Sequence, residues 1–251
     1  MPARLKISKF IPLFFTFILL SGCVSIYNPA TERREMLLID TQKEISLGTD
    51  IDKQLQGRIT ILKDDQMQAR LDSISRRVAL ASDRQDLAYT FRIAKDKELN
   101  AFAIPGGFVY VNTGLLLAAT DDELACVLAH EIGHVASKHS IKKLQAALGY
   151  QLIMSIALGI SGKQAIASAA DVFFNLTSQG YSRQDELFAD KLSVRYSRRA
   201  GFNPYGMVTF FEKLKKEAEK RGPSFSPVFL SSHPAIEERI KKVKEEIALN
   251  P

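Results

Sequence analysis

Apolar residues recur at every third or fourth position in several segments of the chain, and this spacing predicts a mainly helical protein. The segment 66–81 shows the pattern well, because Leu71, Ile74 and Val78 fall on one side of a helix. The same reasoning predicts helices over residues 35–56, 120–139 and 182–196, another from 202–204 onward, and a last helix that ends near residue 248.

A strand is predicted over Tyr89–Ala94, where alternation and β-forming residue types coincide. In the stretch 100–114, Pro105 has no N–H and two glycines follow it, which disfavours a continuous central strand. An edge strand, or a bend that leads into a strand at 108–111, is expected instead. Such an edge presents unpaired backbone groups with which an extended peptide can pair. The predicted fold class is therefore α+β, mainly helical, with a small sheet.

The chemistry is concentrated in His130-Glu131-Ile132-Gly133-His134. The helix that carries it starts at a capping box formed by Thr120 and Glu123. Residues four apart on a helix lie about 40° apart around its axis, so both imidazoles face one side and can share a metal ion. This is the pattern of zinc hydrolases, in which zinc lowers the pKa of a bound water to about 7 and the glutamate takes its proton.

We therefore expect one Zn²⁺ per chain, with His130 and His134 as ligands and Glu131 as the catalytic base. The alternative is an accidental pattern on a helix with two solvated histidines. The helix is apolar on much of its surface, which argues against this alternative, because buried imidazoles need partners.

A catalytic zinc takes three protein ligands and leaves one position for water. A metzincin is excluded, since that class requires a glycine and a histidine where this chain has Ser137 and Ser140. His139 lies about 140° around the helix from His134 and is therefore expected to face away from the site. Glu186 offers a carboxylate from a second helix, and Asp190 one turn later offers an acid that can hold a ligand imidazole by its free N–H. On spacing alone, this pair is more typical of a solvated helix face.

Residues 1–22 have the layout of a secretory signal peptide, with a basic start, an apolar run and small residues at its end. The run Leu20-Ser21-Gly22-Cys23 resembles the lipobox of bacterial lipoproteins, which implies lipidation of Cys23 and attachment to a membrane. An ordinary signal peptide with an incidental cysteine is the alternative. Because Val24 stands where an aspartate would favour inner-membrane retention, the expected location is the periplasmic face of the outer membrane. The expected organisation is a signal peptide (1–22), a lipidated tether (23–34) and one domain (35–251).

The formal charge of +6 falls to 6 − 3 = +3 without Arg4, Lys6 and Lys9, which is too mild to indicate a nucleic-acid partner. Cys126 is expected to be a small buried hydrophobe. The apolar segments 144–160 and 165–176 are interrupted by glycines and polar residues, so their unbroken runs are shorter than the roughly 18 to 20 residues of a membrane span. Helices packed on the domain, or a flap over the cleft, are expected there.

Four ordered motifs resemble the HtpX-type family of zinc metalloendopeptidases, in particular its soluble periplasmic branch. They are Asn-Ala-Phe-Ala-Ile-Pro-Gly-Gly from position 100, the helix motif extended from Glu123 to His139, Ser-Arg-x-x-Glu-x-x-Ala-Asp from 182 and His-Pro-x-x-x-x-Arg from 233. The resemblance covers about 45–247 and implies a zincin-like metallopeptidase domain whose small sheet lies next to the motif helix. It also implies that Glu186 is the third zinc ligand and that Asp190 supports the ligand set.

The resemblance further places His233 at the cleft, where it would stabilise the oxyanion or occupy the open position of zinc in a resting form. A lone loop histidine is otherwise typically an exposed cap. Arg239 is expected to anchor the last helix through a carboxylate. The chain shows nothing like the tetratricopeptide array of part of this branch, which puts partner recruitment of that kind in doubt. The family implies quality control of envelope proteins, with outer-membrane assembly machinery as a possible partner.

The expected function is hydrolysis of peptide bonds in protein or peptide substrates that lie along the edge at Asn100, Ala103, Pro105 and Gly106. One rival is a chaperone or assembly factor for outer-membrane proteins with latent proteolysis. Another is a lipoprotein scaffold with a structural zinc. Only the peptidase requires water at an open zinc position and turnover by Glu131.

Overall fold

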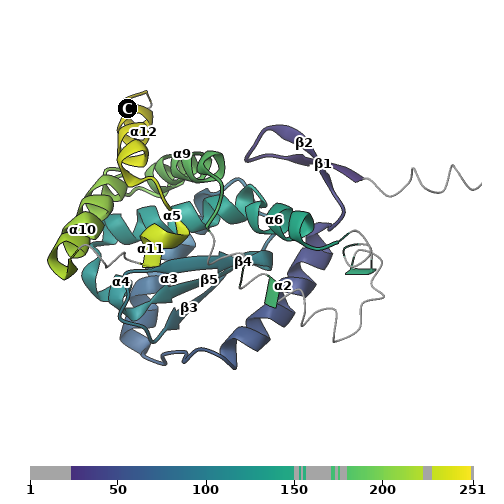
Figure 1. Cartoon of the computed structure of the whole chain (residues 1–251), viewed down its shortest axis with the longest axis horizontal. Helices are drawn as coiled ribbons and strands as arrows, with labels where there is room; N and C mark the ends of the chain where they lie inside the picture. Colours follow the sequence, from purple (N-terminus) through teal and green to yellow (C-terminus); the bar gives the residue numbers. More distant parts are fainter. Residues whose placement is uncertain are drawn as a thin grey trace, which may run out of the picture.

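A computed structural model of the chain describes residues 24–149, 180–222 and 228–249, together with positions 153, 155, 156, 171, 172 and 175. The strands are β1 (Val24–Asn28), β2 (Arg33–Leu37), β3 (Thr90–Ala94), β4 (Ala101–Ile104) and β5 (Phe108–Asn112). The helices are α2 (Thr41–Gln56), α3 (Asp65–Ala81), α4 (Thr113–Ala118), α5 (Asp121–Ala136), α6 (His139–Ala147), α9 (Arg183–Arg199), α10 (Gly206–Arg221), α11 (Val228–Ser232) and α12 (Ile236–Leu249), with a 3₁₀ turn η1 (Pro105–Gly107). The predicted mainly helical α+β class with a small sheet is confirmed (Figure 1).

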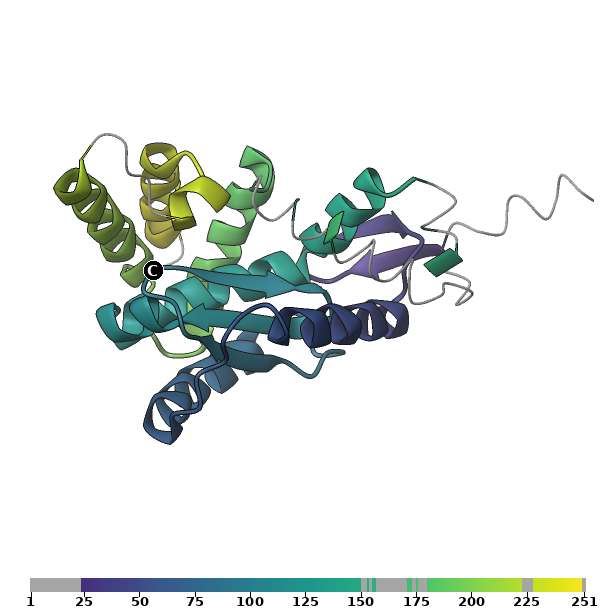
Figure 2. The same cartoon turned by 60° about the horizontal axis from the view of Figure 1, so that its bottom comes forward.

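The three-stranded sheet has the order β3-β5-β4, with β5 parallel to β3 and antiparallel to β4. Side chains alternate along β5, so Val109 and Val111 enter a core shared with α3 and α5, whereas Tyr110 enters a second core shared with α2 and α6. The sheet therefore lies between two layers of helices (Figure 2). β4 is an edge strand, as predicted, and the predicted bend follows it at η1.

Helix α5 is at the centre of the larger core. Thr120 accepts a hydrogen bond from the Glu123 N–H, and the Glu123 carboxylate accepts one from the Thr120 N–H, so the predicted capping box is present. All side chains of α5 from Glu123 to its end are buried, and α3, α9 and α10 pack around it. This enclosure keeps both histidines of the motif away from water.

Helix α2 and the turn η1 meet through a close backbone contact. A Cβ added at Gly48 would lie 2.0 Å from the Pro105 carbonyl oxygen, so only glycine fits at this position. Gly106 has a φ of +80°, a conformation that glycine adopts without strain. The contact fixes where the edge strand β4 ends.

A buried ion pair ties the same helix to the end of α5. Glu44 of α2 accepts hydrogen bonds from Arg84 at 2.6 and 3.0 Å, and both side chains are almost fully buried. Arg84 also donates to the Val135 carbonyl at 2.9 Å, which satisfies a carbonyl in the last turn of α5. Lys138 Nζ lies 3.7 Å from Glu44 and is buried as well.

The start of the domain differs from the sequence prediction. Residues 35–37, predicted as helix, belong to β2, and α2 begins only at Thr41. β1 lies in the segment predicted as a tether and pairs antiparallel with β2. This hairpin depends on partners far along the chain, a Lys142–Glu35 ion pair at 2.6 Å and hydrogen bonding of the Gln145 side chain to the backbone after β2. Local periodicity contains no trace of such contacts.

Smaller differences occur near the C-terminus. α10 begins at Gly206, after the Asn-Pro sequence that was predicted to start it, and the short helix α11 was not predicted. Most of the segments 144–160 and 165–176, the signal peptide and Cys23 lie outside the described residues. Among the residues that the structure does describe, no helix has the length and apolar character of a membrane span.

Candidate metal centre

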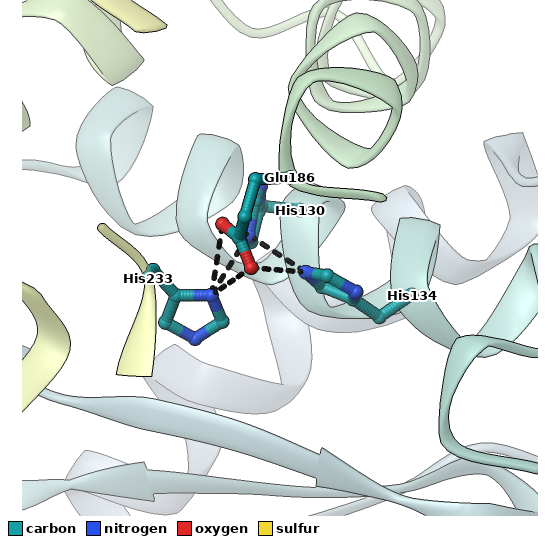
Figure 3. A group of neighbouring side chains, drawn as sticks. All are labelled: His130, His134, Glu186 and His233. Carbon is teal, nitrogen blue, oxygen red and sulfur yellow. Dashed lines mark hydrogen bonds and ion pairs between the residues drawn. The ribbon is translucent and has the colours of Figure 1, made fainter. Parts of the chain in front are cut away.

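Two helices bring together side chains that can bind a metal ion. α5 carries His130 and His134, whose Nε2 atoms are 3.0 Å apart, and α9 carries Glu186, whose carboxylate oxygens lie 3.5 Å from each Nε2. Figure 3 shows these groups facing one another, with His233 beside them. One ligand atom from each of the four residues lies within 4.8 Å of all the others, and all four side chains are buried.

The separation of these two helices is set at Gly133, between the histidines. A Cβ at this position would lie 3.2 Å from the Ala189 carbonyl oxygen and 3.2 Å from Leu192 Cβ, both on α9. Such contacts are tighter than ordinary van der Waals packing. The absence of a side chain at Gly133 therefore lets α9 approach far enough for Glu186 to reach the imidazoles.

Buried charges behind the cluster hold its side chains in place. Asp190 Oδ1 lies 2.9 Å from His130 Nδ1, so the carboxylate can fix this ring with Nε2 directed into the cluster. Arg239 of α12 donates to Asp190 at 2.7 and 2.6 Å and lies 2.9 Å from Glu186. It is 1% exposed, so its charge depends on these buried carboxylates for a partner. The last helix is thereby tied to α9, as expected for Arg239.

The prediction that His139 points away from the site is wrong. α5 ends at Ala136, and Lys138 takes a left-handed conformation with φ +55°, which turns the chain before α6. The turn places His139 Nδ1 2.9 Å from His134 Nδ1 and His139 Nε2 3.3 Å from Asp185. If His134 donates its Nδ1 proton to His139, its Nε2 lone pair remains available to a metal ion.

Glu131 lies between α5 and the edge strand. Its Oε2 accepts a hydrogen bond from the Ala103 N–H at 3.1 Å, and its Oε1 has no hydrogen-bond partner among the described residues. Burial raises the pKa of this carboxyl, although the nearby imidazoles of His233 and His130 oppose the shift. A buried carboxylate with a raised pKa and an available oxygen has the properties of a general base.

His233, from the turn before α12, completes the cluster. Its Nδ1 lies 2.9 Å from Glu186 Oε1 and 3.4 Å from His130 Nε2, and its Nε2 lies 3.5 Å from Glu131 Oε1. Arg239 donates to its backbone carbonyl at 3.0 Å, which fixes the turn. The side chain is 3% exposed, so the alternative of an exposed cap residue is wrong.

The donor set fits a zinc ion. Nitrogen and oxygen ligands at about 2.0–2.1 Å from a tetrahedral zinc are about 3.3 Å apart, close to the separations of 3.0 and 3.5 Å between His130, His134 and Glu186. Burial lowers the pKa of His134 to about 3, whereas hydrogen bonds to Asp190 and Glu186 outweigh burial and raise the pKa of His130 to about 9. The two rings are therefore not both charged at neutral pH, and a zinc ion bound to both Nε2 atoms would take the place of the proton on His130.

The four residues predicted to bind substrate fall in two groups. Ala103 is on β4, and its N–H donates to Glu131. Asn100 lies just before β4 and is 9% exposed. Its buried Oδ1 has no hydrogen-bond partner in the described part of the chain. Pro105 and Gly106 instead pack against the backbone of α2. The structure does not link these two residues to the cluster, and substrate binding by any of the four stays a prediction.

Sequence reasoning missed Tyr181 and His139. The Tyr181 ring stacks on His134 with centroids 4.1 Å apart, and its hydroxyl is 2.8 Å from Ser140 Oγ. His139 was misplaced because the helix was extended through Lys138, and a helix can end at such a residue without a glycine. Tyr181 has no local signal, since its contact depends on how α9 enters the fold.

Helix-borne imidazoles and a carboxylate, enclosed beside the edge strand of a small sheet, define a zincin-like metallopeptidase domain. Comparison with known families agrees with this class. The chain belongs to peptidase family M48, whose sequence model matches residues 65–247. The resemblance that the four motifs indicated is confirmed.

Individual relatives extend the comparison. The chain is 33% identical over 182 residues to the metalloprotease LoiP of Escherichia coli (strain K12), with 71% of this chain and 70% of LoiP aligned. It is 30% identical over 221 residues to the putative beta-barrel assembly-enhancing protease of Vibrio cholerae, which covers 83% of this chain but 45% of that protein. Metalloprotease YcaL of Escherichia coli is 26% identical over 242 residues, with 92% and 93% aligned. The chain thus spans less than half of the barrel assembly-enhancing relative.

Proposed function

We propose that this protein is a zinc-dependent endopeptidase, anchored by lipid on Cys23 in the bacterial periplasm, that hydrolyses peptide bonds of cell-envelope proteins. The observation that carries the proposal is the buried convergence of His130, His134 and Glu186 with Glu131 beside them. Two imidazoles and one carboxylate form a catalytic rather than a structural donor set, because they leave a fourth position for water. The scaffold with a structural zinc is less well supported because Glu131, an acid with the properties of a general base, lies beside the cluster, and a structural site does not need one.

His130, His134 and Glu186 would hold one zinc ion. When bound, zinc supplies a Lewis acid and lowers the pKa of its water to about 7. Asp190 and His139 keep the two imidazoles in the tautomer whose Nε2 accepts the metal. Arg239 balances the charge of Glu186 and Asp190.

Glu131 takes the proton of the attacking water and passes it to the leaving amine. Its Oε1 has no hydrogen-bond partner among the described residues, so this oxygen is available for the proton. The raised pKa of the buried carboxyl brings it closer to neutral pH, where proton uptake and release are both efficient.

The edge strand β4 would bind substrate in an extended conformation. Ala103 lies opposite Val109 of β5, but its N–H donates to Glu131. The backbone N–H of Ala103 therefore points away from β5, toward the open edge of the sheet. Alternate residues of a strand direct their backbone groups to the same side, so Ala101 presents its N–H and C=O to this open edge as well. Because the Ala103 N–H already donates to Glu131, the Ala103 carbonyl and the backbone groups of Ala101 are the ones that could pair with a substrate backbone, which suits an enzyme that cuts within chains.

The geometry favours the resting role for His233. Its Nδ1 lies beside Glu186 and His130, where it is a fourth donor to the cluster. An oxyanion stabiliser should instead lie beside the position of the substrate carbonyl. We infer that His233 fills the position of the catalytic water in the latent enzyme and withdraws when the protein becomes active.

Two relatives are named for enhancing beta-barrel assembly, and this supports envelope proteins as substrates. Quality control of those proteins is proposed from the resemblance of the four motifs. The two relatives also favour a second candidate, an assembly factor for outer-membrane proteins with latent proteolysis. A latent site filled by His233 is compatible with the endopeptidase and with the assembly factor. Measured hydrolysis of a protein substrate distinguishes these two functions.

The deciding experiment compares casein digestion by the protein and by its Glu131→Gln variant, with and without a chelator. The variant keeps every proposed ligand, so it should retain zinc, measured by atomic absorption, and lose hydrolysis. Hydrolysis that survives either the substitution or the chelator would contradict the mechanism. A wild-type protein that holds zinc and prevents aggregation of unfolded barrels without cutting them would favour the assembly factor.

A further inference from the structure

The hairpin β1–β2 has one face that no other part of the described chain covers. Paired residues of antiparallel strands lie on the same face, and so do residues two apart along a strand. Ser25 pairs with Met36 and Tyr27 pairs with Arg34, so these four side chains share one face, and all four are exposed. Tyr27 is 55% exposed and Met36 is 69% exposed. They are among the few large apolar side chains in the described chain with this much exposure.

The opposite face of the hairpin fixes it to the domain. Leu37 is buried, and Ile26 packs on the same core as α2 and α6. Glu35 pairs with Lys142 at 2.6 Å and also accepts hydrogen bonds from Asn28 and Thr31. The hairpin is therefore a rigid part of the domain, and its exposed face has a fixed direction. In Figures 1 and 2 it lies beside α6, at the opposite end of the molecule from α10 and α12.

The position of this face along the chain indicates what covers it. Cys23 directly precedes Val24, the first residue of β1, so no flexible tether separates the proposed lipid from the hairpin. A residue spans at most about 3.6 Å, so Tyr27 lies within about 15 Å of the acylated residue. Met36 pairs with Ser25, only two residues from Cys23. The polar zone on each side of a bilayer is several ångströms thick, and a tyrosine prefers this depth.

We propose that the exposed face of β1–β2 lies against the membrane surface, with Tyr27 and Met36 in the interfacial zone and Arg34 at the lipid phosphates. The proposal rests on lipidation of Cys23, which is part of the proposed function. A hairpin docked in this way holds the peptidase domain at a fixed height and orientation above the bilayer. The substrates within its reach would be chain segments at the membrane surface rather than proteins diffusing through the periplasm.

The chain contains no tryptophan, so a single introduced tryptophan reports on its own surroundings. The test uses the full chain, exported and processed in cells and purified from membranes, as Tyr27→Trp. The matched control is Tyr205→Trp, next to α10 at the other end of the molecule and 42% exposed. Both proteins are reconstituted in vesicles of phosphatidylethanolamine and phosphatidylglycerol with or without bromine on the acyl chains. Mass spectrometry of each sample establishes acylation of Cys23, and casein digestion establishes peptidase activity separately.

The expected result is a blue-shifted emission of Tyr27→Trp, quenched at least twofold by brominated lipid, with no change for Tyr205→Trp. Adding Met36→Glu should reduce that quenching, because a charge at the same depth disfavours insertion. Acylated protein in which both tryptophans respond equally would overturn the docked hairpin and leave the lipid anchor intact. A blue shift without quenching would mean that another part of this chain or a second copy covers the face, and it would overturn the proposal. Absence of an acyl group on Cys23 would overturn the anchor and this inference together.

Discussion

Replacing Arg84 by methionine should strongly destabilise the domain. Arg84 makes two hydrogen bonds to Glu44, at 2.6 and 3.0 Å, and one to the Val135 carbonyl at 2.9 Å. Arg84 is 4% exposed and Glu44 1% exposed, so water cannot replace these bonds. Methionine keeps an unbranched chain in the same space. The substitution therefore isolates the charge and leaves Glu44 buried without its main partner.

Removal of one member of a buried ion pair costs about 3–5 kcal/mol, because the remaining charge stays buried. Lys138 Nζ, 3.7 Å from Glu44, can take over part of the pairing. We therefore expect the lower end, about 3 kcal/mol, in a free energy of unfolding that is about 5–15 kcal/mol for a typical protein. Arg84→Met/Glu44→Gln should recover part of the loss, since it removes both charges of the pair and keeps an acceptor for the Gly106 N–H. The recovery is incomplete because Lys138 then loses its carboxylate partner.

Urea unfolding followed by circular dichroism measures these differences. Arg76→Met is the control, because Arg76 is 77% exposed and lies 3.7 Å from Asp72; it should change the free energy of unfolding by less than about 0.5 kcal/mol. If Arg84→Met costs less than about 1 kcal/mol, or if the double variant is less stable than the single one, the assignment of Arg84 and Glu44 as a mutually dependent buried pair is wrong.

Three further predictions concern the metal centre. Glu186→Ala should lose zinc as well as activity, and full zinc occupancy after dialysis would point to a different third ligand. His139→Ala should weaken zinc binding about 10- to 100-fold, measured by chelator competition, because His134 loses the partner of its Nδ1 proton; unchanged affinity would refute that role. His233→Ala should raise basal casein cleavage if His233 fills the water position at rest, whereas a drop in kcat of about a hundredfold with unchanged zinc affinity would assign it to the oxyanion.

The elements of this fold that were predicted correctly are those determined by residues close together in the sequence. The capping box at Thr120 and the apolar stripe of α3 need only neighbours in the same helix, and both are present as predicted. Pro105 predicted the bend after β4, because a residue without an N–H cannot donate to a neighbouring strand, whatever the rest of the fold is. The pairing of β3 with β5 is parallel and comes from the packing of the whole domain, so no local pattern reports it.

The candidate site follows the same division. The spacing of His130 and His134 is a property of one helix, whereas the contact of Arg239 with Asp190 joins residues 49 positions apart. The error at His139 came from extending a helix through Lys138, a residue that takes a positive φ although it is not glycine. The hairpin β1–β2 was missed because its stability comes from Lys142 and Gln145, more than a hundred residues away.

The close approach of α5 and α9 at Gly133 has a consequence for the distances between the proposed ligands. A methyl group there would push α9 outward by a few tenths of an ångström and carry the Glu186 carboxylate with it. Zinc–ligand bonds of about 2.0–2.1 Å tolerate little lengthening, whereas calcium accepts about 2.3–2.6 Å. If the cluster holds zinc, as proposed, a side chain at residue 133 would therefore weaken the metal site through helix packing alone, with every ligand still in place.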